Sequence, residues 1–147
     1  MEVKIKKLYP DAVVPFKTYN EDFCYDCVAT SCEEVAPDVY KYGIGLAFEI
    51  DRKGRYAACN VSLDFRPRSS VWKTGMILSN CEGTVDELYR GEVSAVFYHI
   101  MKDMPKYEVG DKIVQCKLGV AEPLHFIVTD ELSETKRGSG AYGSTGK

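Results

Sequence analysis

The amino-acid sequence predicts an all-β fold, and three observations support this prediction. Short runs rich in Val, Ile, Phe and Tyr recur along the chain, and several alternate between apolar and polar residues, as strands with one buried face do. Turn-forming residues separate the runs, as in Asp51-Arg-Lys-Gly54 and Glu82-Gly83. Stretches with helical periodicity are scarce. Strands at this spacing indicate a sandwich or barrel, such as a jelly roll.

The expected strands extend from the N-terminus to residue 128. They are Glu2–Lys7, Tyr42–Ile50, Tyr56–Phe65, Met76–Ser79, Glu92–Ile100, Lys112–Leu118 and Leu124–Val128. Only Ser69–Lys73 and Asp86–Tyr89 are expected to form a helical turn, and each is too short to form more than one or two turns.

Composition and charge narrow the class of protein. A chain of 147 residues, 45% hydrophobic and 28% charged, matches one ordinary globular domain. Its 19 Lys and Arg against 22 Asp and Glu give a net charge of −3, so we expect no nucleic-acid partner, which would require a basic stripe. No apolar run reaches membrane-spanning length, and the charged N-terminus lacks an apolar signal region. We therefore expect no membrane association and a cytoplasmic location.

The six cysteines include one CxxC pair, Cys24-Tyr-Asp-Cys27, so a zinc or redox site must be considered. A closed zinc site needs four ligands. The sequence has no second CxxC, and His99 and His125 lie far apart without paired spacing. We therefore prefer the interpretation that the thiols are reduced and mostly buried.

The end of the chain differs in composition from the rest. We expect a β-barrel domain over residues 1–130, then a linker and a glycine-rich arm over residues 131–147, which cannot bury enough surface to order itself. Gly146-Lys147 is no P-loop, because Ala141 stands where the first Gly is required and no Ser or Thr follows. Disorder alone and an arm that orders on a ligand are both open interpretations. Arg137 suits a phosphate and Tyr142 suits a nucleobase, which favours a lid for a nucleotide.

Five short motifs occur in order along the chain. They are Tyr25-Asp26; Arg68-Ser69-Ser70 followed by Gly75; Asn80-Cys-Glu-Gly83-Thr-Val-Asp86-Glu-Leu-Tyr89-Arg90-Gly91; Gly110-Asp-Lys-Ile-Val-Gln115; and the tail Arg137–Lys147. In these motifs and their order, the chain resembles the trimeric dUTP diphosphatases over nearly its whole length. The third and fifth motifs are the most specific. The resemblance implies a jelly-roll-like (β-clip) barrel that assembles as a homotrimer with a flexible C-terminal arm.

The resemblance also implies an activity and a catalytic residue. The family hydrolyses dUTP to dUMP and pyrophosphate, which keeps uracil out of DNA and supplies dUMP. Water attacks the α-phosphorus in line, and this reaction needs positioning, charge neutralisation and one base. Asp86 would be that general base, although without its motif it would be interpreted as an exposed turn residue. Tyr89 would lie against the deoxyribose and exclude a 2′-hydroxyl.

Further positions are implied to bind the substrate and its metal ion. They are Arg68, Ser69, Ser70 and Gln115 for the phosphates, Asn80, Gly83 and Val85 in the third motif, and Arg137, Tyr142, Gly143 and Ser144 in the closing tail. The negative triphosphate calls for Mg²⁺, bound mainly through phosphate oxygens. Asp26 would hold one of the waters of the ion, or would serve as a local structural carboxylate.

In the family, one site takes its motifs from three subunits, so the implied partners are dUTP and further copies of the chain. Ala141 and Phe23-Cys24 depart from the family pattern, which has Gly and smaller residues there. Three alternatives stay open: the related dCTP deaminase, a dUTPase-like nucleotide-binding regulatory protein, and a structural β-trimer. The combination of Asp86, Tyr89 and Arg137 favours the hydrolase.

Overall fold

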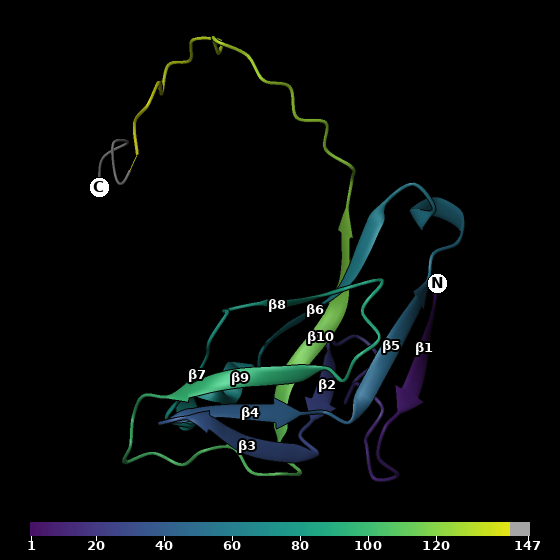
Figure 1. The fold of residues 1–147 in the computed structure, drawn as a ribbon, viewed down its shortest axis with the longest axis vertical. Coiled ribbons are helices and arrows are strands. Elements are labelled where there is room, and N and C mark those ends of the chain that lie inside the picture. Colours follow the sequence, from purple (N-terminus) through teal and green to yellow (C-terminus); the bar gives the residue numbers. More distant parts are fainter. Residues whose placement is uncertain (142–147) are drawn as a thin grey trace.

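The computed structural model describes residues 1–141, and these form an all-β fold, as predicted (Figure 1). No helix in this part of the chain is long and apolar enough to span a membrane. The strands are β1 (Glu2–Lys7), β2 (Tyr25–Val28), β3 (Ser31–Ala36), β4 (Val39–Gly43), β5 (Leu46–Asp51), β6 (Asn60–Pro67), β7 (Met76–Leu78), β8 (Gly83–Asp86), β9 (Ser94–His99) and β10 (Lys112–Ala121). Two short 3-10 helices are described, η1 (Gly54–Tyr56) and η2 (Ser69–Lys73).

The strands form three antiparallel sheets, with the orders β1-β5, β2-β10-β6-β8 and β3-β4-β9-β7. In Figure 1, β4 and β9 cross β10, so the two four-stranded sheets form two layers. Each layer contributes alternate residues to the core, as Val61, Leu63 and Phe65 of β6 do. This alternation is the pattern from which the strands were predicted.

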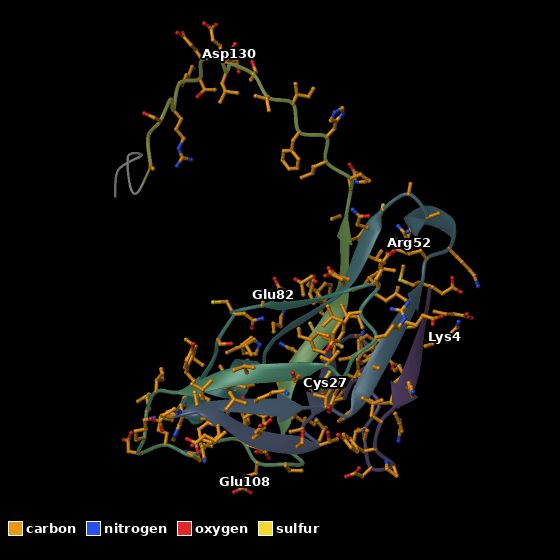
Figure 2. The ribbon with its side chains drawn as sticks, in the orientation of Figure 1. Lys4, Cys27, Arg52, Glu82, Glu108 and Asp130 are labelled. Atoms are coloured by element: carbon orange, nitrogen blue, oxygen red, sulfur yellow. The ribbon has the colours of Figure 1, made fainter. Side chains whose placement is uncertain are left out.

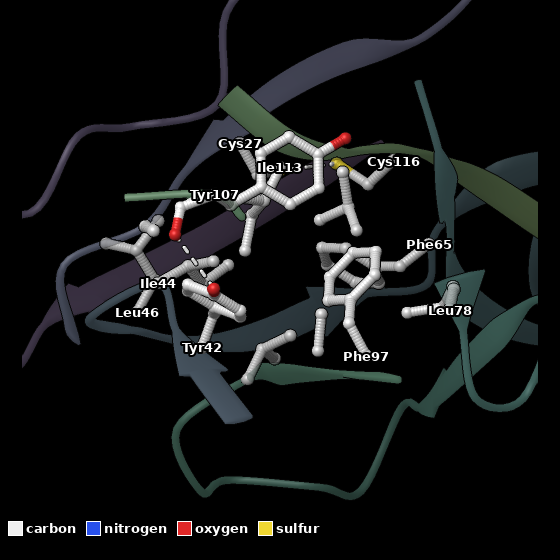
Figure 3. Close-up of a cluster of buried hydrophobic side chains, with 14 of the residues drawn as sticks. Cys27, Tyr42, Ile44, Leu46, Phe65, Leu78, Phe97, Tyr107, Ile113 and Cys116 are labelled. Atoms are coloured by element: carbon white, nitrogen blue, oxygen red, sulfur yellow. Dashed lines mark hydrogen bonds between the residues drawn. The ribbon is translucent and has the colours of Figure 1, made fainter. Parts of the chain in front are cut away.

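Aromatic side chains of the β4–β9 sheet and of the loop before β10 pack together in the core (Figure 3). Phe97 meets Tyr42 edge to face at 5.9 Å and Tyr107 at 5.3 Å between ring centroids, an arrangement that aromatic pairs favour. The buried Tyr42 hydroxyl donates to the backbone oxygen of Tyr107 at 2.8 Å. The core therefore fixes the loop before β10, where Tyr107 lies, as well as the strands.

The sequence predicted one strand over Tyr42–Ile50, but the structure divides it into β4 and β5 at a corner. Gly45 has a φ of +68° there, a conformation that glycine adopts without strain. The backbone of Ile44 donates to the oxygen of Val93 at 3.1 Å. The corner is thereby attached to the loop that precedes β9.

Two other local predictions had different outcomes. Ser69–Lys73 forms the helical turn η2, as expected. Asp86–Tyr89 is not a helix: Asp86 ends β8, and the chain then makes a single turn in which the Tyr89 N–H donates to the Asp86 oxygen at 3.0 Å.

The prediction of a strand over Leu124–Val128 is wrong for the single chain. After β10 ends at Ala121, the chain leaves the two sheets and runs away from them (Figure 1). Leu124, Phe126 and Ile127 are at least 75% exposed, and Val128 is 99% exposed. The apolar pattern is that of a strand, but a strand forms only against a neighbouring edge, and within residues 1–141 no edge pairs with this segment.

Candidate functional site

The turn between β7 and β8 frames a small cavity of about 120 Å³. Asn80 and Gly83 line it, together with Leu78 and Ser94. Gly83 pairs with Phe65 of β6, and a Cβ at Gly83 would lie 3.3 Å from the Asn80 side-chain nitrogen. A side chain at position 83 would therefore require the Asn80 amide to shift by a few tenths of an ångström, and glycine leaves Asn80 where it is.

Asp86 and Tyr89 line a second cavity of about 200 Å³. Val85 and Ser94 also contribute to its wall, and Ser94 belongs to the first cavity as well. Asp86 is exposed at the end of β8. The third motif of the sequence thus forms two adjoining hollows, one at the turn and one beside a carboxylate that faces solvent.

Arg68 follows β6 and lies in a cluster of opposite charges. Its Nε donates to Asp26 Oδ1 at 2.8 Å, and its Nη1 lies 3.4 Å from the Ser70 hydroxyl oxygen. Lys112 Nζ lies 3.0 Å from Asp26 Oδ2. Both carboxylate oxygens of Asp26 therefore face cations. These contacts hold Arg68 in place immediately before η2.

Gln115 reaches the same cluster because β10 lies between β2 and β6. It pairs with Asp26 on one side and with Arg66 on the other, and its side-chain nitrogen donates to the Pro67 oxygen at 3.3 Å. A cavity of about 410 Å³ opens here, lined by Asp26, Arg68 and Gln115 among others. Ser69, exposed, begins η2 beside it.

Lys112 is a cation of this cluster that sequence reasoning missed. A register shift between Lys112 and Val114 lies in the β10–β2 pairing, so simple alternation along β10 does not predict which face Lys112 shares. Its place in the fourth motif, three residues before Gln115, was the only available signal.

The two cysteines of the CxxC pair lie in different environments in this structure. Cys24 lines the Arg68 cavity, whereas Cys27 is buried and its sulfur lies 3.7 Å from that of Cys116. The hydrogen bond with Cys116 and burial together raise the pKa of the Cys27 thiol. Within residues 1–141 no three Cys, His, Asp or Glu side chains gather as a metal cluster.

The two groups of site residues lie toward opposite ends of β6. Asp86 pairs with Ser62 near one end, and Arg68 follows the other end. Six residues separate these positions, which in a strand corresponds to roughly 20 Å. One chain therefore does not bring Asp86 and Arg68 into one cavity.

Arg137 lies on the arm, away from both groups. Figure 2 shows the arm around Asp130 apart from Cys27 on β2 and from Glu82 in the turn before β8. The Arg137 Nε donates to the Gly140 oxygen at 2.9 Å. The predicted contacts of Tyr142, Gly143 and Ser144 lie outside the described residues.

Comparison with known proteins identifies the family. The dUTPase family model matches residues 11–146. The chain belongs to the dUTPase family. The deoxyuridine 5′-triphosphate nucleotidohydrolase of Nautilia profundicola is 32% identical over 149 residues and covers 100% of both chains. That of Helicobacter pylori strain P12 is 31% identical over 150 residues, covering 99% of this chain and 97% of the relative.

Solved dUTPases share the fold at lower identity. A Staphylococcus bacteriophage 80alpha dUTPase with dUpNHpp has a TM-score of 0.78 at 18% identity, covering 99% of both chains. The dUTPase of phage phi11 of S. aureus, in which the coordination of a structural Mg(II) ion is described, has a TM-score of 0.68 at 15% identity and covers 91% of this chain and 100% of its own. These likenesses support the jelly-roll architecture predicted from the sequence.

Proposed function

We propose that this protein is a homotrimeric dUTP diphosphatase that converts dUTP to dUMP and pyrophosphate with the help of Mg²⁺. Family membership supports the reaction class. The main supporting observation is that Ser94 lines both the turn cavity and the cavity of Asp86 and Tyr89, so the two cavities adjoin at this residue. A nucleoside that lies across this wall has its base at the turn and its sugar beside Tyr89.

Asp86 is the proposed general base. Its carboxylate is exposed at the end of β8, where a water molecule can reach it. Asp86 orients this water and takes its proton while the water attacks the α-phosphorus. The bond from the α-phosphorus to the bridging oxygen breaks, and pyrophosphate leaves. No covalent intermediate with the protein is required.

Base selection is assigned to the turn that Asn80 and Gly83 frame. Backbone N–H and C=O groups of a tight turn can match the donor and acceptor pattern of uracil, which cytosine does not share. The narrow space at Gly83 opposes the methyl group of thymine. A methyl group changes specificity by about 1–3 kcal/mol, whereas a mismatched hydrogen bond costs more. Val85 lines the cavity beside this turn, and Tyr89 excludes the 2′-hydroxyl of ribose.

Phosphate binding is assigned to Arg68, Ser69, Ser70 and Gln115. Asp26 and Lys112 hold Arg68 in a fixed position, which favours a directed contact with a phosphate. When bound, Mg²⁺ would neutralise charge on the triphosphate and would keep several of its waters, so it would need no cage of protein ligands. Asp26 fits this mode through Oδ1, which accepts from Arg68 Nε and has a further lone pair for a water of the ion, whereas Oδ2 faces both Lys112 Nζ and Arg68 Nη2.

The separation of Asp86 and Arg68 along β6 supports the proposed trimer. A site that uses both needs them from different copies, and a closed threefold ring supplies three such sites. The exposed apolar segment Leu124–Val128 supports the same conclusion, because it resembles a strand whose partner edge belongs to another chain. Residues 131–147 are then the lid that brings Arg137, Tyr142, Gly143 and Ser144 to the nucleotide.

Pyrophosphate release from dUTP, dTTP, dCTP and UTP with Mg²⁺ tests the activity. We expect dUTP to exceed dTTP in kcat/KM by about 10- to 200-fold, with stronger rejection of dCTP. Release of ammonia from dCTP would instead indicate the deaminase. Tight dUTP binding without turnover would indicate the regulatory alternative.

Removal of the arm tests the lid. A chain that ends at Lys136 should remain trimeric by light scattering, because Leu124–Val128 is retained. Its kcat/KM for dUTP should fall about 100-fold, since closure of a lid positions the substrate and excludes water. The matched control is Lys136→Ala in the full-length chain, which should keep its activity. Full activity of the shortened chain, or loss of the trimer, would contradict the lid.

A further inference from the structure

The loop that carries Tyr89 is attached to the rest of the fold through the side chain of Glu92. Glu92 is half-buried and lines the cavity of Asp86 and Tyr89. Its Oε1 accepts the backbone N–H of Gly45 at 2.9 Å. The carboxylate therefore connects this cavity to the corner between β4 and β5.

The backbone of the same residue receives the Tyr89 hydroxyl. The Tyr89 oxygen donates to the Glu92 carbonyl oxygen at 3.0 Å. The next residue, Val93, is fixed to the corner from both sides: its oxygen accepts from Ile44 at 3.1 Å and its N–H donates to the Leu46 oxygen at 3.0 Å. The Glu92 carbonyl that accepts from Tyr89 thus lies in a segment with three hydrogen bonds to the corner: one from the Glu92 carboxylate and two from the Val93 backbone.

Packing around this segment leaves little room for alternatives. A Cβ at Gly43 would clash with the Glu92 carboxylate and lie 2.6 Å from the Ser31 hydroxyl oxygen. A Cβ at Gly91 would clash with the Tyr89 hydroxyl. Glycine at both positions therefore permits the carboxylate and the phenol to lie where they do.

Tyr89 needs such an attachment because burial does not hold it. Its side chain is 48% exposed, so contact with the core does not determine the position of the ring. A ring that excludes a 2′-hydroxyl must be held to within a fraction of an ångström.

We propose that Glu92 is a positioning residue that fixes the Tyr89 ring and thereby sets the preference for deoxyribose over ribose. This inference rests on the proposed function, in which Tyr89 lies against the sugar. Glu92 acts through Tyr89 and through the corner at Gly45, and it takes no part in the chemical step.

The first test compares Glu92→Ala with Glu92→Gln. The ratio of kcat/KM for dUTP to that for UTP should fall about tenfold in Glu92→Ala, because the Gly45 N–H loses its acceptor and the loop loosens. Glu92→Gln keeps an acceptor oxygen and should restore the ratio to within about twofold of wild type. A residue with a merely structural role would lower both rates together. Glu33→Ala, an exposed glutamate on β3, is the matched control and should leave the ratio unchanged.

A second test separates the path through Tyr89 from other effects. Tyr89→Phe removes the hydroxyl donor and should lower the same ratio. The double variant Tyr89→Phe/Glu92→Ala should lose no more than the larger of the two single losses, because the two changes break successive contacts of one path from Gly45 to the Tyr89 ring. Additive losses would overturn the proposal.

Two further measurements keep this inference apart from the proposed function. Hydrogen exchange of the Gly45 amide should accelerate in Glu92→Ala and stay slow in Glu92→Gln; unchanged protection in Glu92→Ala overturns the attachment. If the wild type releases no pyrophosphate from dUTP, the proposed function fails. The ratio of the dissociation constants of dUMP and UMP then tests the sugar preference, and an equal ratio in wild type and Glu92→Ala overturns it.

Discussion

Replacing Asp86 by Asn should lower the rate of pyrophosphate release from dUTP by about 1,000-fold, within the range by which a general base accelerates such reactions. The amide has the shape of the carboxylate but cannot take the proton of the attacking water. In residues 1–141 no hydrogen bond or ion pair occupies the Asp86 side chain, so its carboxylate is available to a water molecule. The loss should appear in kcat, measured in a continuous pyrophosphate assay at saturating dUTP.

Binding measurements distinguish a chemical defect from a binding defect. The dissociation constant of the imido analogue dUpNHpp should change by less than about tenfold in Asp86→Asn, since the general base acts on water and not on the nucleotide. Asp103→Asn, in the exposed turn that follows β9, is the matched control and should retain the wild-type rate. Equal rates for wild type and Asp86→Asn would remove Asp86 from the mechanism.

Strands with regular alternation could be predicted from the sequence, whereas corners and edge segments could not. The apolar positions of β6 repeat every second residue, so burial on one face follows directly. Tyr42–Ile50 has the composition of one long strand, and its division at Gly45 depends on attachment to Val93, which is distant in sequence. The exposed strand β3 lacks a continuous apolar face, so its pattern gave no signal.

The site was predictable in its residue types but not in its arrangement. The motifs identified Arg68, Gln115 and Asp26, and the structure brings these three together. The distance from Arg68 to Asp86 depends on the register of β8 on β6, which no local pattern encodes. Glu92 was missed for a similar reason, because its partner Gly45 lies 47 residues earlier in the chain.

Mixing two inactive variants should restore activity if one site takes Asp86 and Arg68 from different chains. Asp86→Asn and Arg68→Ala should each be nearly inactive alone. The Arg68→Ala chain should still fold, because Asp26 retains its ion pair with Lys112. When equal amounts are unfolded and refolded together, about a quarter of the sites combine an intact Asp86 with an intact Arg68 from a neighbouring chain. Pyrophosphate release should then reach about a quarter of the wild-type rate per site.

A second mixture rules out a trivial recovery. In this mixture, wild type is refolded with an equal amount of the double variant Asp86→Asn/Arg68→Ala. About a quarter of all sites should be intact if the two residues come from different chains, but about a half if they come from one chain. If the site is shared between chains, the two mixtures should therefore give the same activity. In a site built within one chain, the first mixture would stay inactive and the second would retain half. The roughly 20 Å between Asp86 and Arg68 along β6 favours the shared outcome, because two residues so far apart in one chain cannot act on one phosphorus atom.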